Sequence, residues 1–278
     1  MTKIINESFD AERALYESVD LEAINCRFEG EADGESAFKE CKNIKAVGCF
    51  FDLRYPFWHD EKVVIESSEM TQNCRASLWY SNKIEITNTK MHGIKALREC
   101  KGVKIKDCDI ISPEFGWSTT DLVCENTTAV GEYFMMRGEN LRFENLNFSG
   151  KYSFQYIKNA HFENCVLNTK DAFWHAENIT VKNCVVNGEY LAWYCKDVTF
   201  ENCKISGTQP LCYCENLKMI NCELTNADLC FERSSVEATI TTPIISVKNV
   251  LSGFVEAPRI DEIICDSPKF KGEVKITK

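Results

Sequence analysis

A six-residue phrase recurs between residues 143 and 224 with a constant period of 19. Each copy has an apolar residue first and Asn third, and in four of the five copies Cys follows the Asn. A short fixed period is typical of a repeat protein, in which each repeat packs only against its neighbours. The five copies read FENLNF from Phe143, FENCVL from Phe162, VKNCVV from Val181, FENCKI from Phe200 and MINCEL from Met219.

The same register extends beyond these copies in both directions. The spacing between equivalent residues is longest in the first step and slightly extended in the third, and it is constant in all others. The extra residues of the longer steps lie near 30–36 and 71–75, where we expect short polar loops. Twelve repeats result, with one position held by Leu15, Phe38, Phe57, Leu78, Leu97, Gly116, Met135, Phe154, Phe173, Ala192, Leu211 and Cys230.

The period inside one repeat is that of a β-strand. Apolar and polar residues alternate in AHFE from Ala160 and in VTFE from Val198, and Asn or Gly turn signals follow, as at Asn187 and Gly188. Three short strands and their turns use the whole repeat, so no room is left for a crossover helix. Stacked repeats of this kind predict an all-β fold, a single-stranded parallel β-helix.

Residues one repeat apart form columns that support this prediction. A column ending with Val236 is apolar in every repeat and is expected to face the interior. Another column is Asn or Asp from Asn88 to Asn221, and Asn suits both stacking between strands and a left-handed corner. A Cys-rich column is expected to fill an inside corner, and Glu and Lys alternate in an outer one. The Cys column holds Cys26, Cys49, Cys108, Cys165, Cys184, Cys203 and Cys222, and the charged column Glu139, Lys158, Glu177, Lys196 and Glu215.

The repeat predicts one domain over residues 1–278. We expect residues 1–14 to form an N-terminal cap and residues 15–236 to form the regular turns. Residues 237–278 are expected to form degenerate turns and a C-terminal cap, since an uncovered last turn is an open sheet edge.

Charge and composition narrow the partners. The chain has 32 Lys and Arg residues and 42 Asp and Glu residues, which gives a net charge of −10. This charge disfavours a nucleic acid as the partner. No apolar stretch suits a membrane span, and the N-terminus lacks an export signal, so we expect a cytoplasmic protein. The 16 cysteines are then expected to be free, reduced thiols packed as small apolar residues. We expect no cofactor and no metal site.

Five short motifs recur in the third segment of the repeat: PFWH from Pro56, SLWY from Ser77, YSF from Tyr152, DAFW from Asp171 and GEYL from Gly188. These motifs resemble those of a widespread microbial family catalogued as a domain of unknown function. The resemblance covers essentially the whole chain and implies a right-handed β-helix, similar in shape to pectate-lyase-like proteins. It implies no catalytic residue.

All five tryptophans occupy one column, and Tyr, His and Glu are frequent in the next. The Trp column also contains Lys39, Arg98 and Gln155, which favours an outward or corner position, although the pattern leaves open which column faces solvent. The candidate ligand-binding residues are Trp58, His59, Trp79, Tyr80, Arg98, Glu99, Trp117, Trp174, His175, Trp193 and Tyr194.

Three interpretations of these aromatic residues stay open: a buried packing stack, a protein interface or a ligand surface. Exposed ring faces would suit the apolar faces of sugars. The leading hypothesis is a non-catalytic scaffold or binding module for a carbohydrate or protein partner, with a homo-oligomer as a further option.

The alternative hypothesis is a carbohydrate-active hydrolase or lyase. Glu144 and Glu163 stand on successive turns of one outer face, with His161 nearby. Carboxylates about 5 Å apart match the acid/base and nucleophile of a retaining glycosidase. A second arrangement for this alternative is His59 with Arg98 and Glu99. A charged face neutralised by Lys and Arg neighbours explains the same pattern, so the sequence leaves open whether the protein is an enzyme.

Overall fold

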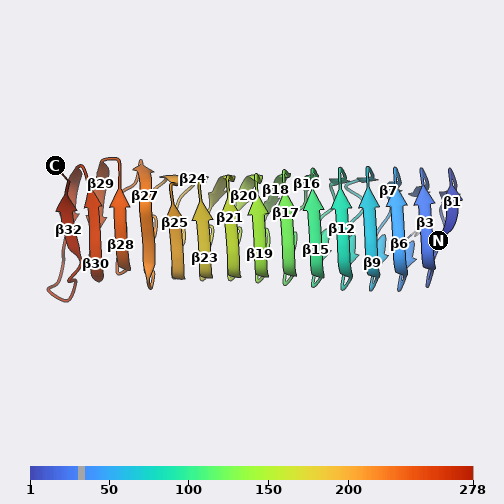
Figure 1. The fold of residues 1–278 in the computed structure, drawn as a ribbon, viewed down its shortest axis with the longest axis horizontal. Helices are drawn as coiled ribbons and strands as arrows, with labels where there is room; N and C mark the ends of the chain where they lie inside the picture. The colour runs from blue at the N-terminus through green and yellow to red at the C-terminus, as the bar shows by residue number, and fades with distance from the viewer. Residues whose placement is uncertain (31–34, 278) are drawn as a thin grey trace. The chain divides into compact units, whose positions relative to one another are not determined.

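The computed structural model describes residues 1–30 and 35–277, and the chain divides into two compact units, Met1–Leu141 (unit 1) and Arg142–Lys278 (unit 2). Both units consist of β-strands joined by tight turns (Figure 1). The described residues contain no helix, and so none that could span a membrane. The boundary between the units falls inside β19 (Glu139–Glu144).

Unit 1 contains three parallel ladders of strands. The first consists of β1 (Thr2–Ile5), β3 (Val19–Ile24), β6 (Lys42–Val47), β9 (Glu61–Glu66), β12 (Asn82–Thr87), β15 (Lys101–Lys106) and β17 (Thr120–Glu125). The second consists of β2 (Ser8–Phe9), β4 (Arg27–Glu29), β7 (Phe50–Asp52), β10 (Glu69–Met70), β13 (Lys90–Met91), β16 (Asp109–Ile111) and β18 (Thr128–Glu132). The third is short and consists of β5 (Phe38–Lys39), β8 (Phe57–Trp58), β11 (Leu78–Trp79) and β14 (Leu97–Arg98).

Unit 2 contains the same two kinds of longer ladder. The first consists of β21 (Lys158–Glu163), β23 (Glu177–Lys182), β25 (Lys196–Glu201), β27 (Leu217–Thr225), β28 (Ser235–Ile240), β30 (Ser252–Ala257) and β32 (Glu273–Ile276). The second consists of β20 (Asn147–Lys151), β22 (Val166–Lys170), β24 (Val185–Asn187) and β26 (Lys204–Ser206), and it ends on β27. A separate pair joins β29 (Ile244–Lys248) and β31 (Ile260–Ile264).

Residues one repeat apart lie opposite each other in these ladders. Lys101 pairs with Thr120 in unit 1, and Lys182 pairs with Glu201 in unit 2. The longer steps of the sequence also appear as pairings in unit 1, between β3 and β6 and between β9 and β12. The predicted all-β parallel β-helix is therefore confirmed. Its right-handedness stays a prediction.

The predicted number of turns is too low, because the structure has about 14 turns of about 19 residues. Strand β1, which the sequence assigns to a cap, pairs with β3 in the regular register, Thr2 against Leu21. Strands β28, β30 and β32 continue the ladder at the other end, although the register shortens there and Ser235 pairs with Ser252. Part of the loop expected near 30–36 lies outside the described residues.

The prediction of three strands in every repeat is wrong for unit 2. Its third segments are turns in which every second residue has a positive φ, as at Asp171 (53°), Phe173 (60°) and His175 (56°). Their N–H groups still reach neighbouring turns, from Phe173 to Ser153 O at 3.0 Å and from His175 to Trp193 O at 2.9 Å. The alternating backbone sends successive hydrogen bonds in opposite directions along the ladder, so these segments stay paired without being strands.

The core consists of the predicted interior columns. Every member of the apolar column that ends with Val236 is buried, and so are the seven cysteines of the corner column. Phenylalanine rings stack inside each unit, with centroids 4.9 Å apart for Phe28 and Phe51 and 5.3 Å apart for Phe154 and Phe173. All sixteen cysteines are free thiols, and only Cys265 is exposed.

The Asn column forms the predicted corner ladder. Asn183 and Asn202 have φ values of 54° and 52°, in the left-handed region that Asn tolerates best after Gly. The Asn221 side chain donates to Asn202 Oδ1 at 2.8 Å, and Asn202 donates to Asn183 Oδ1 at 3.3 Å. A second ladder of this kind, not predicted, precedes the apolar column: Asn140 donates to Asp121 at 2.9 Å.

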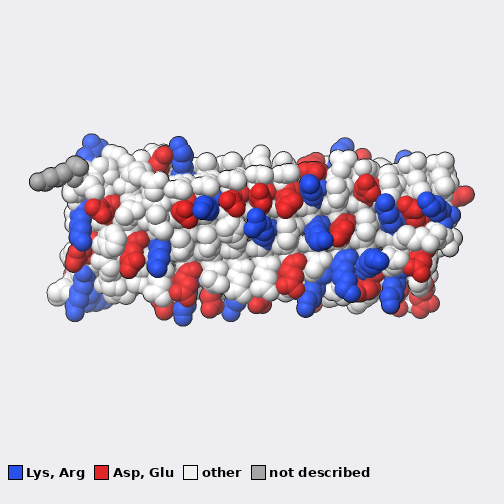
Figure 2. All heavy atoms as spheres, viewed as in Figure 1, with Lys and Arg blue, Asp and Glu red and all other residues white. Residues whose placement is uncertain are grey.

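Charged residues of both signs are interspersed on the face of the molecule seen in Figure 2. Many are paired between successive turns, including the predicted Glu/Lys column, where Lys158 and Glu177 lie 3.2 Å apart and Lys196 and Glu215 lie 3.6 Å apart. Such exposed pairs contribute little to stability individually, but they cancel the repulsion between like charges on neighbouring strands.

Candidate functional site

The tryptophans of unit 1 form a continuous stack. The rings of Trp58 and Trp79 lie 5.5 Å apart at an interplanar angle of 7°. The Arg98 guanidinium lies 5.0 Å from the centroid of Trp79 and 5.3 Å from that of Trp117, so it fills the gap between the two indoles. This geometry is that of a cation–π interaction on both faces of the guanidinium plane.

The tryptophans of unit 2 stack in the same way. The rings of Trp174 and Trp193 lie 5.3 Å apart at 3°. Gln155 occupies the same column, and its side-chain amide donates to Asp171 O at 2.8 Å. Like the tryptophans of unit 1, these two are half-buried. The sequence left open whether the Trp column faces the solvent or the interior, and the column lies between the two.

Each indole is held against the wall by one hydrogen bond. The Nε1–H group donates to a backbone carbonyl of the following turn, at 2.7 Å from Trp174 to Tyr190 and at 2.8 Å from Trp193 to Gln209. The three tryptophans of unit 1 make the same contact, at 2.7–2.9 Å. The column is therefore part of the packing between turns as well as a partly exposed surface.

The neighbouring column contains a second stack that is more exposed. In unit 1 the rings of His59 and Tyr80 lie 4.9 Å apart. In unit 2 the stack has four members, Tyr156, His175, Tyr194 and Tyr213, with successive centroids 4.9, 5.0 and 4.8 Å apart. Tyr156 is 43% and Tyr194 47% exposed. We call these residues, with the tryptophans beside them, the unit 1 strip and the unit 2 strip.

All six rings of this outer column stand on left-handed backbone, with φ between 56° and 60°. Bulky residues rarely adopt that conformation, which costs roughly 1–2 kcal/mol per residue. The corner geometry turns the rings out of the wall, and stacking at one strand spacing offsets part of this cost.

Stacking decides which part of each ring is available to a partner. His175 lies between Tyr156 and Tyr194, so both of its faces are turned toward neighbouring rings. Tyr194 lies in the same way between His175 and Tyr213. The edges of these rings, with the Tyr hydroxyl and the imidazole nitrogens, are what the strip presents to solvent.

The residues of the second catalytic arrangement, His59, Arg98 and Glu99, do not form one cluster of interacting side chains. Glu99 lies 3.5 Å from Arg98 Nε, and Arg98 is held between two indoles. His59 stacks on Tyr80 and lies edge-on to Trp58. Within the described residues, no hydrogen bond or ion pair joins His59 to Arg98 or Glu99.

The carboxylates of the enzyme hypothesis each have a partner on their own strand. Glu144 accepts a hydrogen bond from Arg142 Nη2 at 3.0 Å. Glu163 lies 3.4 Å from His161 Nε2. Both carboxylates are about one-third exposed, with side-chain exposures of 34% and 30%. The structure thus places them on the outer face expected from the sequence, each beside a basic group, and their catalytic role stays a prediction.

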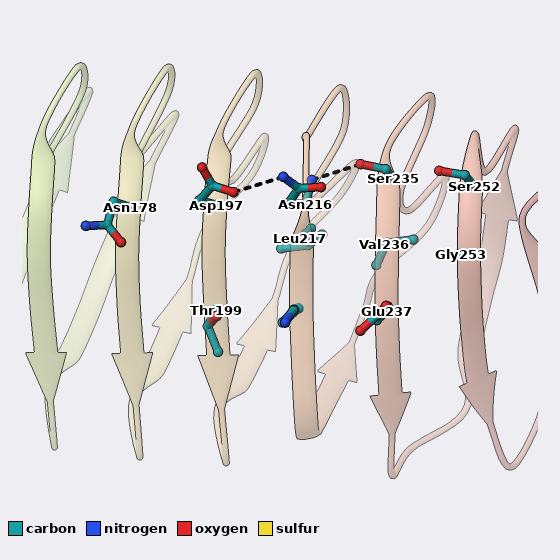
Figure 3. A pocket seen from close by; sticks show the side chains of 11 residues that line it. Asn178, Asp197, Thr199, Asn216, Leu217, Ser235, Val236, Glu237, Ser252 and Gly253 are labelled. Carbon is teal, nitrogen blue, oxygen red and sulfur yellow. Dashed lines mark hydrogen bonds between the residues drawn. The ribbon is translucent and has the colours of Figure 1, made fainter.

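Sequence reasoning missed a hollow on the outer face of the long strands of unit 2. It is lined by residues of β23 (Glu177–Lys182), β25, β27, β28 and β30 and has a volume of about 630 Å³ (Figure 3). A signal was present in the sequence, because Ser235 and Ser252 are small where most turns carry longer side chains on that face. The described residues hold no cluster of three or more His, Cys, Asp or Glu side chains arranged for a metal ion.

The fold and the two strips define a parallel β-solenoid with stacked aromatic columns on its wall. The chain belongs to the family described as "Protein of unknown function (DUF3737)", which matches residues 2–277. No curated protein matches the sequence.

Three solved structures are similar in fold. Bacteriophage CBA120 tailspike protein 3 is 8% identical, with a TM-score of 0.38 over 97% of this chain and 54% of its own, so this chain spans about half of that protein. The A-module of the Azotobacter vinelandii mannuronan C-5 epimerase AlgE4 is 8% identical, with a TM-score of 0.36 over 99% of this chain and 89% of its own. PfbA, a surface adhesin of Streptococcus pneumoniae, is 9% identical, with a TM-score of 0.40 over 94% of this chain and 77% of its own. These likenesses concern the fold alone.

Proposed function

We propose that this protein is a non-catalytic binding module and that the unit 2 strip recognises a protein partner. The observation that carries the proposal is the exposed column of stacked rings, in which Tyr156 and Tyr194 are more than 40% exposed beside half-buried tryptophans. Tyr, Trp and Arg are the residues most often found at the energetic centres of protein interfaces.

The stacking favours a protein over a carbohydrate. A sugar binds an aromatic side chain through the free face of the ring, and the faces of His175 and Tyr194 are turned toward their neighbours. The ring edges carry partial positive charge, and the Tyr hydroxyls can donate. Carbonyl oxygens, carboxylates and aromatic faces of a polypeptide are suitable partners for such a surface.

The rigidity of the strip supports the same proposal. The rings are stacked on one another and stand on a wall whose indoles are hydrogen-bonded to the backbone. A preorganised surface loses little side-chain entropy on binding, which is the main cost that weakens flexible interfaces.

The test uses a photo-crosslinking amino acid in place of Glu215, an exposed residue one turn beyond Lys196 in the charged column. In the cells that naturally make this chain, we expect adducts with one protein species. The double variant Tyr156→Asn/Tyr194→Asn should abolish the adduct. Asn suits the left-handed backbone of both positions, at 58° and 59°, so the variant is expected to fold.

Lys204→Asn is the matched control, because it removes an exposed side chain in β26 and leaves the strip intact. An adduct that forms equally in the double variant would contradict the proposal. A glycan array is run in parallel with the same proteins. A saccharide that binds the unaltered chain and not the double variant would show that the partner of the strip is a carbohydrate.

A further inference from the structure

The hollow in unit 2 is independent of the strips and lies on the outer face of the long strands. Figure 3 shows side chains from β23, β25, β27, β28 and β30, and from the residue just before β27, around it. Its volume of about 630 Å³ is within the range of small-molecule sites, roughly 300–1,000 Å³. Its lining is mostly polar, and it includes both acidic and basic side chains, Asp197, Glu237 and Lys218.

Two small residues of β30 line this hollow. Gly253 has a φ of 85°, and a Cβ atom at this position would lie 2.0 Å from Val236 O. A larger residue is therefore excluded, although Gly253 continues the apolar column of its register partner Val236 and not an outer column. Ser252, its neighbour, is also small, so the long side chains of the preceding turns border an open space.

One edge of the hollow contains a break in the second Asn/Asp ladder. Asn178 donates its amide N–H to Asn159 Oδ1 at 2.9 Å, and Asn216 donates to Asp197 Oδ1 at 2.9 Å. Between Asn178 and Asp197 the ladder has no donor, because the Asn178 nitrogen is turned away and a carboxylate has no proton to give (Figure 3). Among the described residues, no donor reaches Asn178 Oδ1 or Asp197 Oδ2, so two acceptors on successive turns border the hollow.

The opposite part of the hollow contains two oppositely charged side chains that form no ion pair with each other. Lys218 and Glu237 are register partners in β27 and β28, yet they form no ion pair among the described residues. Equivalent register partners elsewhere in unit 2 are bridged, at 3.1 Å for Lys182 and Glu201 and at 3.2 Å for Lys204 and Glu223. The ammonium and carboxylate groups beside the hollow are thus free to bind a third molecule.

We propose that this hollow binds a neutral saccharide. Sugar hydroxyls can donate to Asp197, Glu237 and the Asn178 carbonyl and can accept from the Lys218 ammonium, so one ligand satisfies both kinds of group. The two carboxylates outnumber the one ammonium, which disfavours uronic acids and phosphates. The inference does not rest on the proposed function of the strips, whose residues lie in other columns.

The test titrates the whole chain with cellobiose, maltose, lactose and N,N′-diacetylchitobiose. Backbone NMR monitors the binding of each disaccharide. At least one of these is expected to give saturable shifts at the residues that line the hollow. Glu237→Gln should weaken that binding about tenfold, because one charge-assisted hydrogen bond is replaced by a neutral one. Glu223→Gln is the matched control, since it removes a carboxylate of β27 outside the hollow and should leave the binding unchanged.

Asp197→Asn gives a second readout. The introduced amide can donate to Asn178 Oδ1 and close the ladder, so this variant should unfold at a higher temperature while it binds the saccharide more weakly. The proposal is wrong if no disaccharide of the panel shifts the resonances of the hollow, or if the variant binds as well as the unaltered chain. It is also wrong if Ca²⁺ or digalacturonic acid produces the shifts and the neutral sugars do not.

Discussion

At the scale of the residue, the corners of the solenoid explain much of the repeat. Outside each corner, Asn takes up the left-handed backbone and hydrogen-bonds along its column, as Asn202 does. Inside, a small polar side chain accepts the N–H of the preceding turn, at 3.1 Å for Ser68 from Cys49 and at 3.2 Å for Cys184 Sγ from Cys165. Cys184 therefore fills space and also satisfies a backbone donor.

The two roles of Asn in the corner can be separated at Asn202. Asn202→Gly keeps a residue suited to positive φ and removes the side-chain hydrogen bonds, so we expect a loss of about 1 kcal/mol of unfolding free energy. Asn202→Ala removes both and should cost about 2 kcal/mol. Urea unfolding followed by circular dichroism measures both values. Equal losses would show that the backbone conformation contributes nothing.

The buried position of Asp60 predicts that the stability of the protein depends on pH. It is buried, accepts a hydrogen bond from Cys41 N at 2.7 Å, and its second oxygen has no partner among the described residues. Burial raises its pKa from an ordinary 3.8 to about 8. Between these values the unfolded chain is ionised at Asp60 while the folded chain keeps the proton, so the unfolding free energy falls as the pH rises.

Asp60→Ser should remove this dependence, because Ser81 stands at the equivalent position one turn later and accepts the N–H of Asp60 at 3.0 Å. We expect the variant to be more stable than the unaltered chain at pH 8 by a few kcal/mol, at about 1.4 kcal/mol per unit of pKa shift. Near pH 4 the two should be similar. Thermal unfolding across this pH range tests the prediction, and parallel curves for the two proteins would contradict it.

At the scale of the element, the Trp column joins neighbouring turns through both ring stacking and an N–H hydrogen bond. Trp193 stacks on Trp174 and donates to Gln209 O at 2.8 Å. The indoles are half-buried, so the column is at once a packing element and the base on which the more exposed rings stand.

Trp193→Phe should therefore lower the unfolding free energy by about 1 kcal/mol through the loss of one hydrogen bond while the ring stack remains. Tyr194→Phe is the control, because its hydroxyl has no protein partner among the described residues, and it should change stability by less than about 0.5 kcal/mol. Chemical denaturation of both variants gives the comparison. A larger loss for Tyr194→Phe would mean that the exposed hydroxyl and not the indole N–H holds the turns together.

The period of the sequence predicted which residues share a column, because strands at constant register repeat every physical environment. It could not predict the side of the wall for Trp58 or Trp193, since that depends on a bond to a carbonyl of the next turn and on left-handed corner geometry. The second Asn/Asp ladder was predictable, because Asn140, Asn159 and Asn178 each directly precede an apolar column residue. The hollow was harder to predict, because it lies where the register shortens and the repeat degenerates.

At the scale of the whole molecule, each turn within a unit pairs only with the turns before and after it. The stability of such a protein is approximately a sum over turns and the interfaces between them. One complete turn can therefore be removed without changing the environment of the others. A deletion that breaks the register should have a much larger effect, because a shift by one residue exchanges the inner and outer faces of a strand.

The most direct test of the 19-residue register compares two deletions in unit 2. Deletion of residues 162–180 removes one complete repeat and joins His161 to Val181 in register, whereas deletion of 162–179 removes one residue fewer and shifts Val181 toward the outer face. We predict that the first protein unfolds cooperatively in urea with a β-type circular dichroism spectrum. The second should be less stable by several kcal/mol or fail to fold. Equal unfolding free energies for the two deletions would contradict the claim that residues one repeat apart lie directly over one another.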